Sequence, residues 1–334
     1  MRKYSFLLIV LAFSLLFSMC KPKNQNPQGD GFGNDDLDLP EVVVPDFNAD
    51  SAFLFVKAQT DFGPRVPNGA AHEKCAAYLR EQLAAFCDTV YVQHFDAKAY
   101  NGASLKSQNI IGSFNPQAEK RIILASHWDS RPFADHDPNA ANHDTPIDGA
   151  NDGASGVGVL LEVARQLAIN KPNVGVDIIL FDSEDYGPKE SDSAPFGEWW
   201  GLGAQYWSTH PHKEQYAAQF GILLDMVGDA NAHFRYEMHS KLYARSVLSK
   251  VWNSAYKLGF GNVFLQTDAN PITDDHYYVN KLAQIPMIDI IHQEDASGTG
   301  FPLTWHTLND NIEHIDKNML AKVGTTLLYV VYHE

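Results

Sequence analysis

Three carboxylates lie within four residues in the segment IILFDSEDYG, where Asp182, Glu184 and Asp185 follow an apolar run. Carboxylates this close repel one another, and each resists losing its water at the end of a buried strand. Bulk solvent, a basic partner or a metal ion could compensate them. The segment is therefore the first candidate for a functional site.

Two further apolar runs also end in polar side chains. RIILASHWDS ends with His127 and Asp129, and FGILLDMVG carries Asp225 where its apolar run ends. In open α/β sheets, ligands bind at the carboxyl ends of the strands. Because His127 and Asp129 are two residues apart, they face the same side of an extended segment, where the carboxylate could fix the imidazole tautomer. Taken alone, this pair is better explained as a surface-loop histidine beside a turn.

A glycine-rich stretch, DGANDGASGVGVLLEVARQL, places Asp152 at the start of a helical pattern. An ordinary turn and helix cap compete strongly as its explanation. A phosphate loop is disfavoured because no Gly-Lys-Ser/Thr follows. A calcium loop is disfavoured because the third position counted from Asp148 is Ala150 and no glutamate closes the loop.

His306, in TWHTLNDN, follows a large aromatic residue, and a lone histidine in this setting is more often structural than a ligand. Each candidate alone has a structural explanation, but the set as a whole indicates a functional site. Nitrogen and oxygen ligands of this set suit zinc, and a free neighbouring glutamate, Glu184, suits acid–base catalysis.

The elements that must position these residues alternate along the chain. Helical patterns cover residues 49–62, 69–86, 156–170, 240–258 and 316–333. Short apolar runs typical of strands cover residues 90–95, 110–114, 121–126, 176–181, 221–224 and 286–291. Runs such as RIILAS lack polar alternation and suit a sheet covered on both faces. The sequence predicts a single α/β domain with a mostly parallel, doubly wound central sheet flanked by helices, and no internal repeat.

The composition bounds the function. A chain of 334 residues that is 45% hydrophobic can bury a large core. Its formal net charge of −16 argues against binding nucleic acid or anionic lipid through its own surface.

The N-terminus predicts export. MRKYSFLLIVLAFSLLFSMC begins with basic residues and continues with an apolar run too short for a stable spanning helix, so residues 1–19 are expected to be a secretory signal. Cys20 resembles the lipid-modified cysteine of bacterial lipoproteins. Phe17 and Met19 depart from the usual pattern, so cleavage and release stays open. Residues 20–48 are expected to form a flexible tether, residues 49–334 the catalytic domain, and the location to be the periplasm, with the membrane reached only through the anchor.

Two cysteines remain, Cys75 and Cys87, on or beside one helical pattern. Twelve residues of helix span about 18 Å, which is beyond disulfide reach. Two unpaired, buried thiols are therefore expected.

Five motifs in order, HWDS, GANDGASG, DSED, LLDMVG and WHTLNDN, resemble those of the M28-type zinc aminopeptidases and their relatives, the glutaminyl cyclases. The resemblance runs from about residue 50 to the C-terminus. It implies a zinc ion bound by Asp152, Asp185 and His306, with Glu184 as the acid–base. In the two-zinc aminopeptidases, His127 and Asp225 would complete a second metal site that Asp152 bridges. Asp185 stands where these families normally have a glutamate.

The segments FPLTWHT, with Phe301 and Trp305, and DDH, with Asp274, resemble those of the animal-type glutaminyl cyclases, which are single-zinc enzymes that convert an N-terminal glutamine to pyroglutamate. The resemblance implies one zinc ion per chain, and a substrate amine or amide that hydrogen-bonds to Asp225 and Asp274. Asp289 stands where the animal pattern has a histidine. The resemblance also implies an aromatic pocket, with candidate wall residues Trp199, Trp200, Phe301 and Trp305.

Three classes of function follow. The leading prediction is a glutaminyl cyclase acting on peptides or exported proteins that begin with glutamine. The alternative is a secreted aminopeptidase that uses two metals. A non-catalytic peptide-binding protein is third, and it would be expected to lack Glu184 or a ligand, yet the sequence has them all.

Overall fold

The computed structural model describes residues 42–334. The expected signal, Cys20 and most of the expected tether lie outside these residues. Within them the helices are α1 (Ala49–Thr60), α2 (Ala70–Phe86), α3 (Ala154–Ile169), α4 (Leu202–Thr209), α5 (Met238–Tyr243), α6 (Arg245–Lys257), α7 (Asp275–Tyr278) and α8 (Lys317–Tyr332). The strands are β1 (Thr89–Lys98), β2 (Ser104–Phe114), β3 (Arg121–His127), β4 (Gly175–Phe181), β5 (Phe220–Asp225), β6 (Phe234–Tyr236), β7 (Phe264–Asp268) and β8 (Met287–Ile291).

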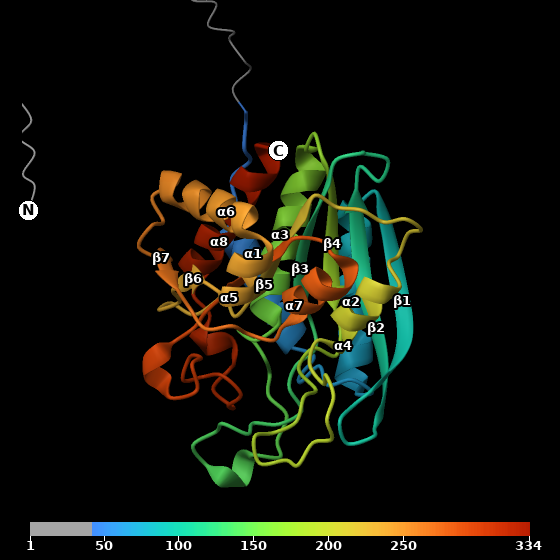
Figure 1. The fold of residues 1–334 in the computed structure, drawn as a ribbon, viewed down its shortest axis with the longest axis vertical. Coiled ribbons are helices and arrows are strands. Elements are labelled where there is room, and N and C mark those ends of the chain that lie inside the picture. The colour runs from blue at the N-terminus through green and yellow to red at the C-terminus, as the bar shows by residue number, and fades with distance from the viewer. Residues whose placement is uncertain (1–41) are drawn as a thin grey trace, which may run out of the picture. The chain divides into compact units, whose positions relative to one another are not determined.

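Six strands form the central sheet in the order β1-β2-β4-β3-β5-β8 (Figure 1). Strands β4, β3, β5 and β8 run parallel, whereas β2 pairs antiparallel with both β1 and β4. Helix α3 connects β3 to its neighbour β4, as parallel strands require. The predicted α/β fold with a mostly parallel sheet is confirmed.

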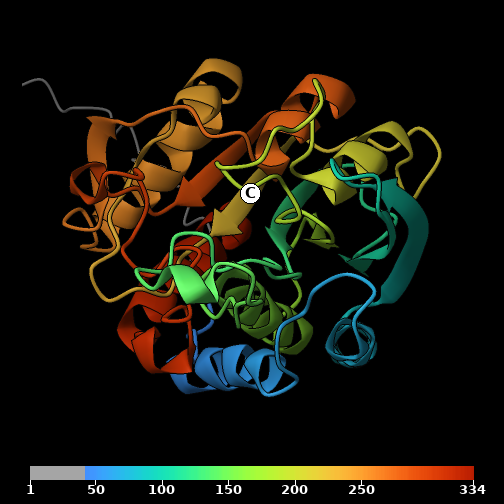
Figure 2. The same ribbon diagram turned by 90° about the horizontal axis from the view of Figure 1, so that it is seen from below.

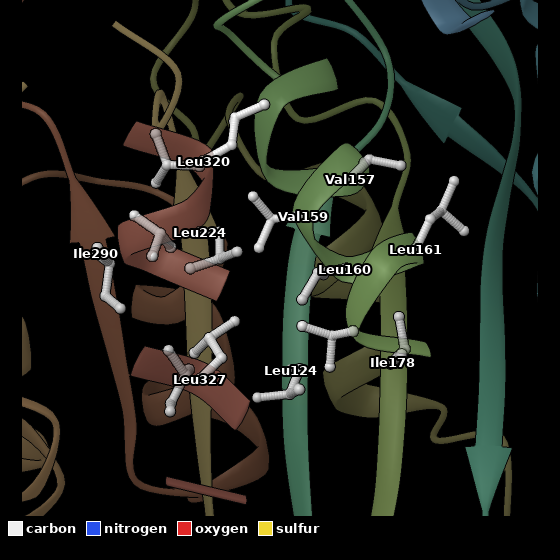
Figure 3. Packing of buried hydrophobic residues seen from close by; sticks show 14 of the residues in the cluster. Leu124, Val157, Val159, Leu160, Leu161, Ile178, Leu224, Ile290, Leu320 and Leu327 are labelled. Atoms are coloured by element: carbon white, nitrogen blue, oxygen red, sulfur yellow. The ribbon is translucent and has the colours of Figure 1, made fainter. Parts of the chain in front are cut away.

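The sheet is covered on both faces. Along β3, Ile122 and Leu124 belong to one apolar cluster, while Ile123 and Ala125 belong to another. Helices α2, α3 and α8 cover the first face, with α1 packed against α3 and α8, and Figure 3 shows side chains of α3 and α8 lying over its strands. Helix α4 and the α7 region cover the second face. Each fully buried aliphatic side chain contributes about 1.5–3 kcal/mol to folding, which explains why the β3 sequence is apolar at successive positions.

The predicted helices and strands are all present, with one error in the helices. The segment 240–258 forms two helices, because Ala244 breaks the pattern with φ −135° and ψ 38°. Helices α4 and α7 and the separate two-stranded sheet β6-β7 were not predicted. These elements are short, so each offers too few turns or alternations for a periodic signal.

The two cysteines are free. Cys75 is buried within α2, but the prediction that both thiols are buried was wrong for Cys87, which is half-buried. The helix ends at Phe86, and the backbone at Cys87 is extended (φ −85°, ψ 154°).

The long loops gather at one end of the sheet. Figure 1 shows the loops of residues 128–150 (green), 186–200 (yellow) and 293–310 (red) together below it, and Figure 2 looks at this end. Strands β3, β4 and β5 are parallel, so their carboxyl ends share one edge. Within residues 42–334, no helix combines the length and the apolar character that crossing a bilayer would require.

Candidate active site

The candidate residues come from five separate places in the chain. His127 and Asp225 are the last residues of β3 and β5. Glu184 and Asp185 follow the end of β4, and Asp152 precedes α3. His306 comes from the loop that follows β8. All six are buried, because the strand ends and loops cover them.

Two overlapping sets of possible metal ligands result. Asp152, Asp185 and His306 form one set and His127, Asp152 and Asp225 the other, with one ligand atom per residue and all such atoms of a set within 4.8 Å of one another. Asp152 belongs to both sets through different oxygens. Its Oδ1 lies 3.0 Å from His127 Nε2, and its Oδ2 lies 3.6 Å from His306 Nε2.

The set Asp152, Asp185 and His306 fits zinc. His306 Nε2 lies 3.3 Å from Asp185 Oδ1, so an imidazole nitrogen and carboxylate oxygens converge on one point. Asp185 Oδ2 is buried without a hydrogen-bond partner in the described part of the chain. A cation would compensate this otherwise costly group. Asp185 therefore reaches the ligand set although its side chain is one methylene shorter than glutamate.

Left-handed backbone turns occur where the functional residues lie. This conformation is unfavourable for residues that carry a Cβ. It occurs at Ser183 (φ 57°), Met226 (φ 49°) and His306 (φ 53°). Ser183 immediately precedes Glu184, and Met226 immediately follows Asp225. The hydroxyl of Ser183 is tied to that of Ser107 on β2 at 2.6 Å, which helps to hold the first of these turns.

Glycines beside Asp152 allow α3 to approach the sheet. Gly153 has φ 93°, and a Cβ there would meet the carbonyl oxygen of Asp129 at 2.7 Å. A Cβ at Gly156 would meet Ser126 Oγ at 2.3 Å. The glycine-rich motif therefore serves a tight turn and close packing, and this places Asp152 at the carboxyl end of β3.

Two buried carboxylates hold the backbone of the ligand segments. Asp129 accepts the N–H groups of Glu184 (3.1 Å) and Asp185 (3.2 Å), and its Oδ1 lies 3.5 Å from His127 Nδ1. Asp310 accepts the N–H of Asp152 at 3.0 Å. Asp129 was a candidate from the sequence, whereas Asp310 was missed, although it lies in the TWHTLNDN motif.

Asp182, the remaining carboxylate of the DSED motif, points away from these ligands. Both of its oxygens lie 2.9 Å from His72 Nε2, and one accepts the N–H of Gln108 at 2.6 Å. The His72 ring in turn stacks on Trp128 at 4.3 Å. These contacts give Asp182 a structural role.

Arg131 and Asp135 support the site and were not singled out in the sequence. The Arg131 guanidinium donates to both oxygens of Asp135 at 2.7 Å and to the Asp185 carbonyl at 3.1 Å. Asp135 Oδ1 lies 3.5 Å from His306 Nδ1. A carboxylate behind a ligand histidine fixes its ring and raises its basicity. The only signal in the sequence is an Arg and an Asp four residues apart directly after HWDS.

Burial changes the acidity of the carboxyls that face the cavity. It raises the pKa of Glu184 well above its ordinary value, and the charge of Asp274 adds to this effect. Burial also raises the pKa of Asp225 to about 7. A raised pKa favours a carboxyl group that both accepts and returns a proton.

A cavity of about 600 Å³ opens over these carboxyls. Glu184, Asp225 and Asp274 lie in its wall. Trp305 stacks on His306 with ring centroids 3.6 Å apart, and Arg131 lies 5.0 Å from the Trp200 ring. The aromatic residues of the wall are Phe196, Trp199, Trp200, Phe301 and Trp305. All four aromatic candidates from the sequence are among them.

The family model described as Peptidase family M28 matches residues 109–331. This chain belongs to peptidase family M28. It is 52% identical to a solved Bacteroides thetaiotaomicron glutaminyl cyclase bound to N-acetylhistamine, with a TM-score of 0.86 over 87% of this chain and 100% of that one. A solved Zn-dependent exopeptidase from Parabacteroides distasonis is 49% identical, with a TM-score of 0.86 and the same two coverages.

Curated relatives of this M28 member are more distant. Aminopeptidase YwaD of Bacillus subtilis is 29% identical over 68% of this chain and 44% of its own length. Glutaminyl-peptide cyclotransferase of Gloydius blomhoffii is 26% identical over 66% of this chain and 63% of its own length. The match thus spans less than two thirds of either relative. The zinc-dependent neighbour and the ligand geometry agree on zinc as the cofactor.

Proposed function

We propose that this M28 member is a zinc-dependent glutaminyl cyclase, which converts an N-terminal glutamine to pyroglutamate and releases ammonia. The observation that carries the proposal is the shared cavity. Glu184, Asp225 and Asp274 face the same space as the tryptophan walls and the ligand set. The identity with the Bacteroides cyclase over most of the chain supports it.

The residues that would hold zinc are Asp152, Asp185 and His306. When bound, zinc supplies Lewis acidity that polarises the substrate γ-carbonyl and stabilises the negative charge that develops on its oxygen.

Glu184 moves the proton. The substrate α-amine attacks the γ-amide carbon, a carbon–nitrogen bond forms, and the bond to the amide nitrogen breaks. Glu184 accepts the proton that the amine loses and returns it to the departing ammonia, so the glutamate ends the cycle unchanged. Its raised pKa suits both steps.

Asp225 and Asp274 orient the substrate. Both carboxyls line the cavity and can accept hydrogen bonds from the α-amine or the amide. Closing a five-membered ring then exploits the high effective molarity of an oriented intramolecular reaction. The aromatic walls exclude water, which would otherwise compete as the nucleophile.

Mass spectrometry on a Gln-initiated peptide, with the protein from Ala49 onward and one equivalent of zinc, tests the proposal. Loss of ammonia with the chain otherwise intact is the expected result. Loss of the whole N-terminal residue, from this peptide or from a Leu-initiated control, would instead identify an aminopeptidase. If zinc binds and neither change occurs, the outcome favours the third class of function, a non-catalytic peptide-binding protein.

An aminopeptidase is the second candidate because the set His127, Asp152 and Asp225 could hold another metal. The metal content separates the two functions. One zinc per chain in the active protein supports the cyclase, and a requirement for two supports the peptidase.

We also propose that the chain is exported to the periplasm and anchored through a lipid on Cys20, on the basis of its N-terminal sequence. Metabolic labelling with palmitate, compared with a Cys20→Ala variant, tests the anchor. Labelled wild-type protein in the membrane fraction and an unlabelled variant are expected. Wild-type protein without label would contradict the anchor.

A further inference from the structure

A chain of buried polar side chains lies behind Asp274, outside the zinc-ligand set. Its members are Glu237, which caps α5, His276 of α7 and Asp289 of β8, and all three are 0% exposed. Buried ionisable groups are costly unless they are paired. The partners of these three side chains therefore indicate what the side chains can do.

Glu237 accepts four hydrogen bonds. Its Oε1 accepts the N–H groups of His239 (2.8 Å) and Ile272 (3.0 Å). Its Oε2 accepts the N–H of Ser240 (2.6 Å) and lies 3.0 Å from His276 Nε2. Ile272 lies in the cavity wall. One carboxylate thus ties the cap of α5 to the loop that leads into Asp274.

His276 continues the chain. Because its Nε2 faces Glu237, its Nδ1 faces Asp289 Oδ2, at an ion-pairing distance of 3.6 Å. One side-chain oxygen or ring nitrogen from each of Asp274, His276 and Asp289 lies within 4.8 Å of the others.

Asp289 connects His276 to Asp274. Both oxygens of Asp289 and Oδ2 of Asp274 are buried without a hydrogen-bond partner among the described residues, so the two carboxyls face each other with a proton-sharing position open. Burial raises the pKa of Asp289 well above its ordinary value, and the charges of Asp274 and Asp225 add to this effect. A protonated Asp289 can donate to Asp274 and thereby orient it.

We propose that Glu237 and His276 are positioning residues which, through Asp289, fix the Asp274 carboxyl in one orientation toward the substrate amine or amide. The inference rests on the proposed cyclase function and adds residues from outside the cavity to it. None of the three is a ligand in either metal set at the strand ends.

The first test is His276→Gln. Glutamine places an amide near the former Nε2, so it keeps a partner for Glu237 while losing the contact toward Asp289. We expect kcat for Gln-peptide cyclisation to fall about 10- to 100-fold, since small misplacements of catalytic groups cost this much. The zinc content should stay near the wild-type value, and the variant should remain folded at the assay temperature. A wild-type kcat in this variant would overturn the proposal.

The second test compares Asp289→Asn with Asp289→Ala. The asparagine amide can still donate to Asp274, so kcat should stay within about threefold of wild type, whereas alanine should reproduce the loss seen in His276→Gln. Equal losses in the two variants would contradict the donor role. The control is His292→Gln, which also replaces a buried histidine but lies outside the cavity over Glu184. It should leave kcat unchanged.

The third test does not need turnover. In the ¹⁵N spectrum of histidine-labelled, zinc-loaded protein, the His276 Nδ1 resonance should shift in Asp289→Ala and stay in place in His292→Gln. An unmoved resonance would show that Asp289 does not contact His276, and the proposal would fail. A metal ion lost from Asp289→Ala but held by wild type would also overturn it, in favour of a cation site at these residues. If wild-type protein releases no ammonia, the proposed function fails. The spectrum still decides whether His276 contacts Asp289.

Discussion

Asp129 accepts the backbone N–H of Glu184 through Oδ1 at 3.1 Å, and its other oxygen accepts the next N–H, that of Asp185. One carboxylate at the end of β3 therefore fixes both the proposed acid–base and a proposed zinc ligand after β4. Asp129 is 0% exposed, so water does not compete for these hydrogen bonds. The spacing between the proposed proton carrier Glu184 and the proposed zinc ligand Asp185 is thus set by the backbone before any substrate binds.

Asp129→Asn tests this arrangement. Asparagine offers one acceptor oxygen, and its amide would face an N–H group, so one of the two hydrogen bonds is lost. We expect zinc affinity to fall about 10- to 100-fold, measured by competition with a chelator. Asp268→Asn, at an exposed residue paired with Lys241, is the matched control and should bind zinc like wild type. Unchanged affinity in Asp129→Asn would show that these hydrogen bonds do not position the ligand.

Glu184→Gln removes the proposed proton carrier and preserves the size of the side chain. We expect the rate of ammonia release to fall by about 10²- to 10⁴-fold while zinc stays bound, because Glu184 is adjacent to the ligands but is not one of them. Ammonia release and metal content are measured on the same sample. Substantial activity in a zinc-loaded variant would refute the acid–base role.

Trp305 tests the aromatic wall. Its ring stacks on His306 and lines the cavity. We expect Trp305→Ala to raise KM more than Trp305→Phe does, because phenylalanine keeps part of the aromatic face. Removing a stacked aromatic contact should cost about 1 kcal/mol or more in kcat/KM. Equal KM values in both variants and wild type would place the substrate elsewhere.

Glu237 makes stability depend on pH. Burial opposes its ionisation, but the hydrogen bond and charge of His276 lower its pKa from 4.5 to about 2. A lowered carboxyl pKa contributes stability that is present above pH 4.5 and is lost as the pH falls toward 2. The full shift corresponds to about 3 kcal/mol.

Glu237→Gln should therefore destabilise the protein by roughly 3 kcal/mol at neutral pH. The difference from wild type should shrink by about 1 kcal/mol on going to pH 4. Urea unfolding at the two pH values measures both quantities. A difference that grows on acidification would have the wrong sign for this mechanism.

Much of the fold could be predicted because its signal is local. The apolar runs of β3, β4 and β5 pack on both faces, so their sequences lack polar alternation and mark a covered sheet. The residues that follow these runs were therefore predicted to meet at one edge, and they do. The break at Ala244 was not predictable, because its neighbours keep a helical pattern across it.

The support around the site could not be predicted in the same way. Glu237 and His276 are 39 residues apart and meet only in the folded chain. Arg131 and Asp135 lie in a loop without periodicity, where charged residues are ordinarily solvated. The burial of Arg131 and the partial burial of Asp135, which strengthen their interactions, depend on the loops that pack over them. Sequence patterns indicate which face of a helix or strand is buried and where the chain turns. The roles of these four residues instead arise from contacts between distant segments.

The order in which the site can form during synthesis follows from the sheet topology. Asp152 and Asp185 are made early, but His306 comes from the last loop before α8, near the C-terminal end of the chain. A nascent chain therefore lacks the only imidazole of the zinc set Asp152, Asp185 and His306 until residue 306 has been made. The metal can be captured with full affinity only after that point, so a chain truncated before His306 would lack a ligand of the zinc set as well as α8.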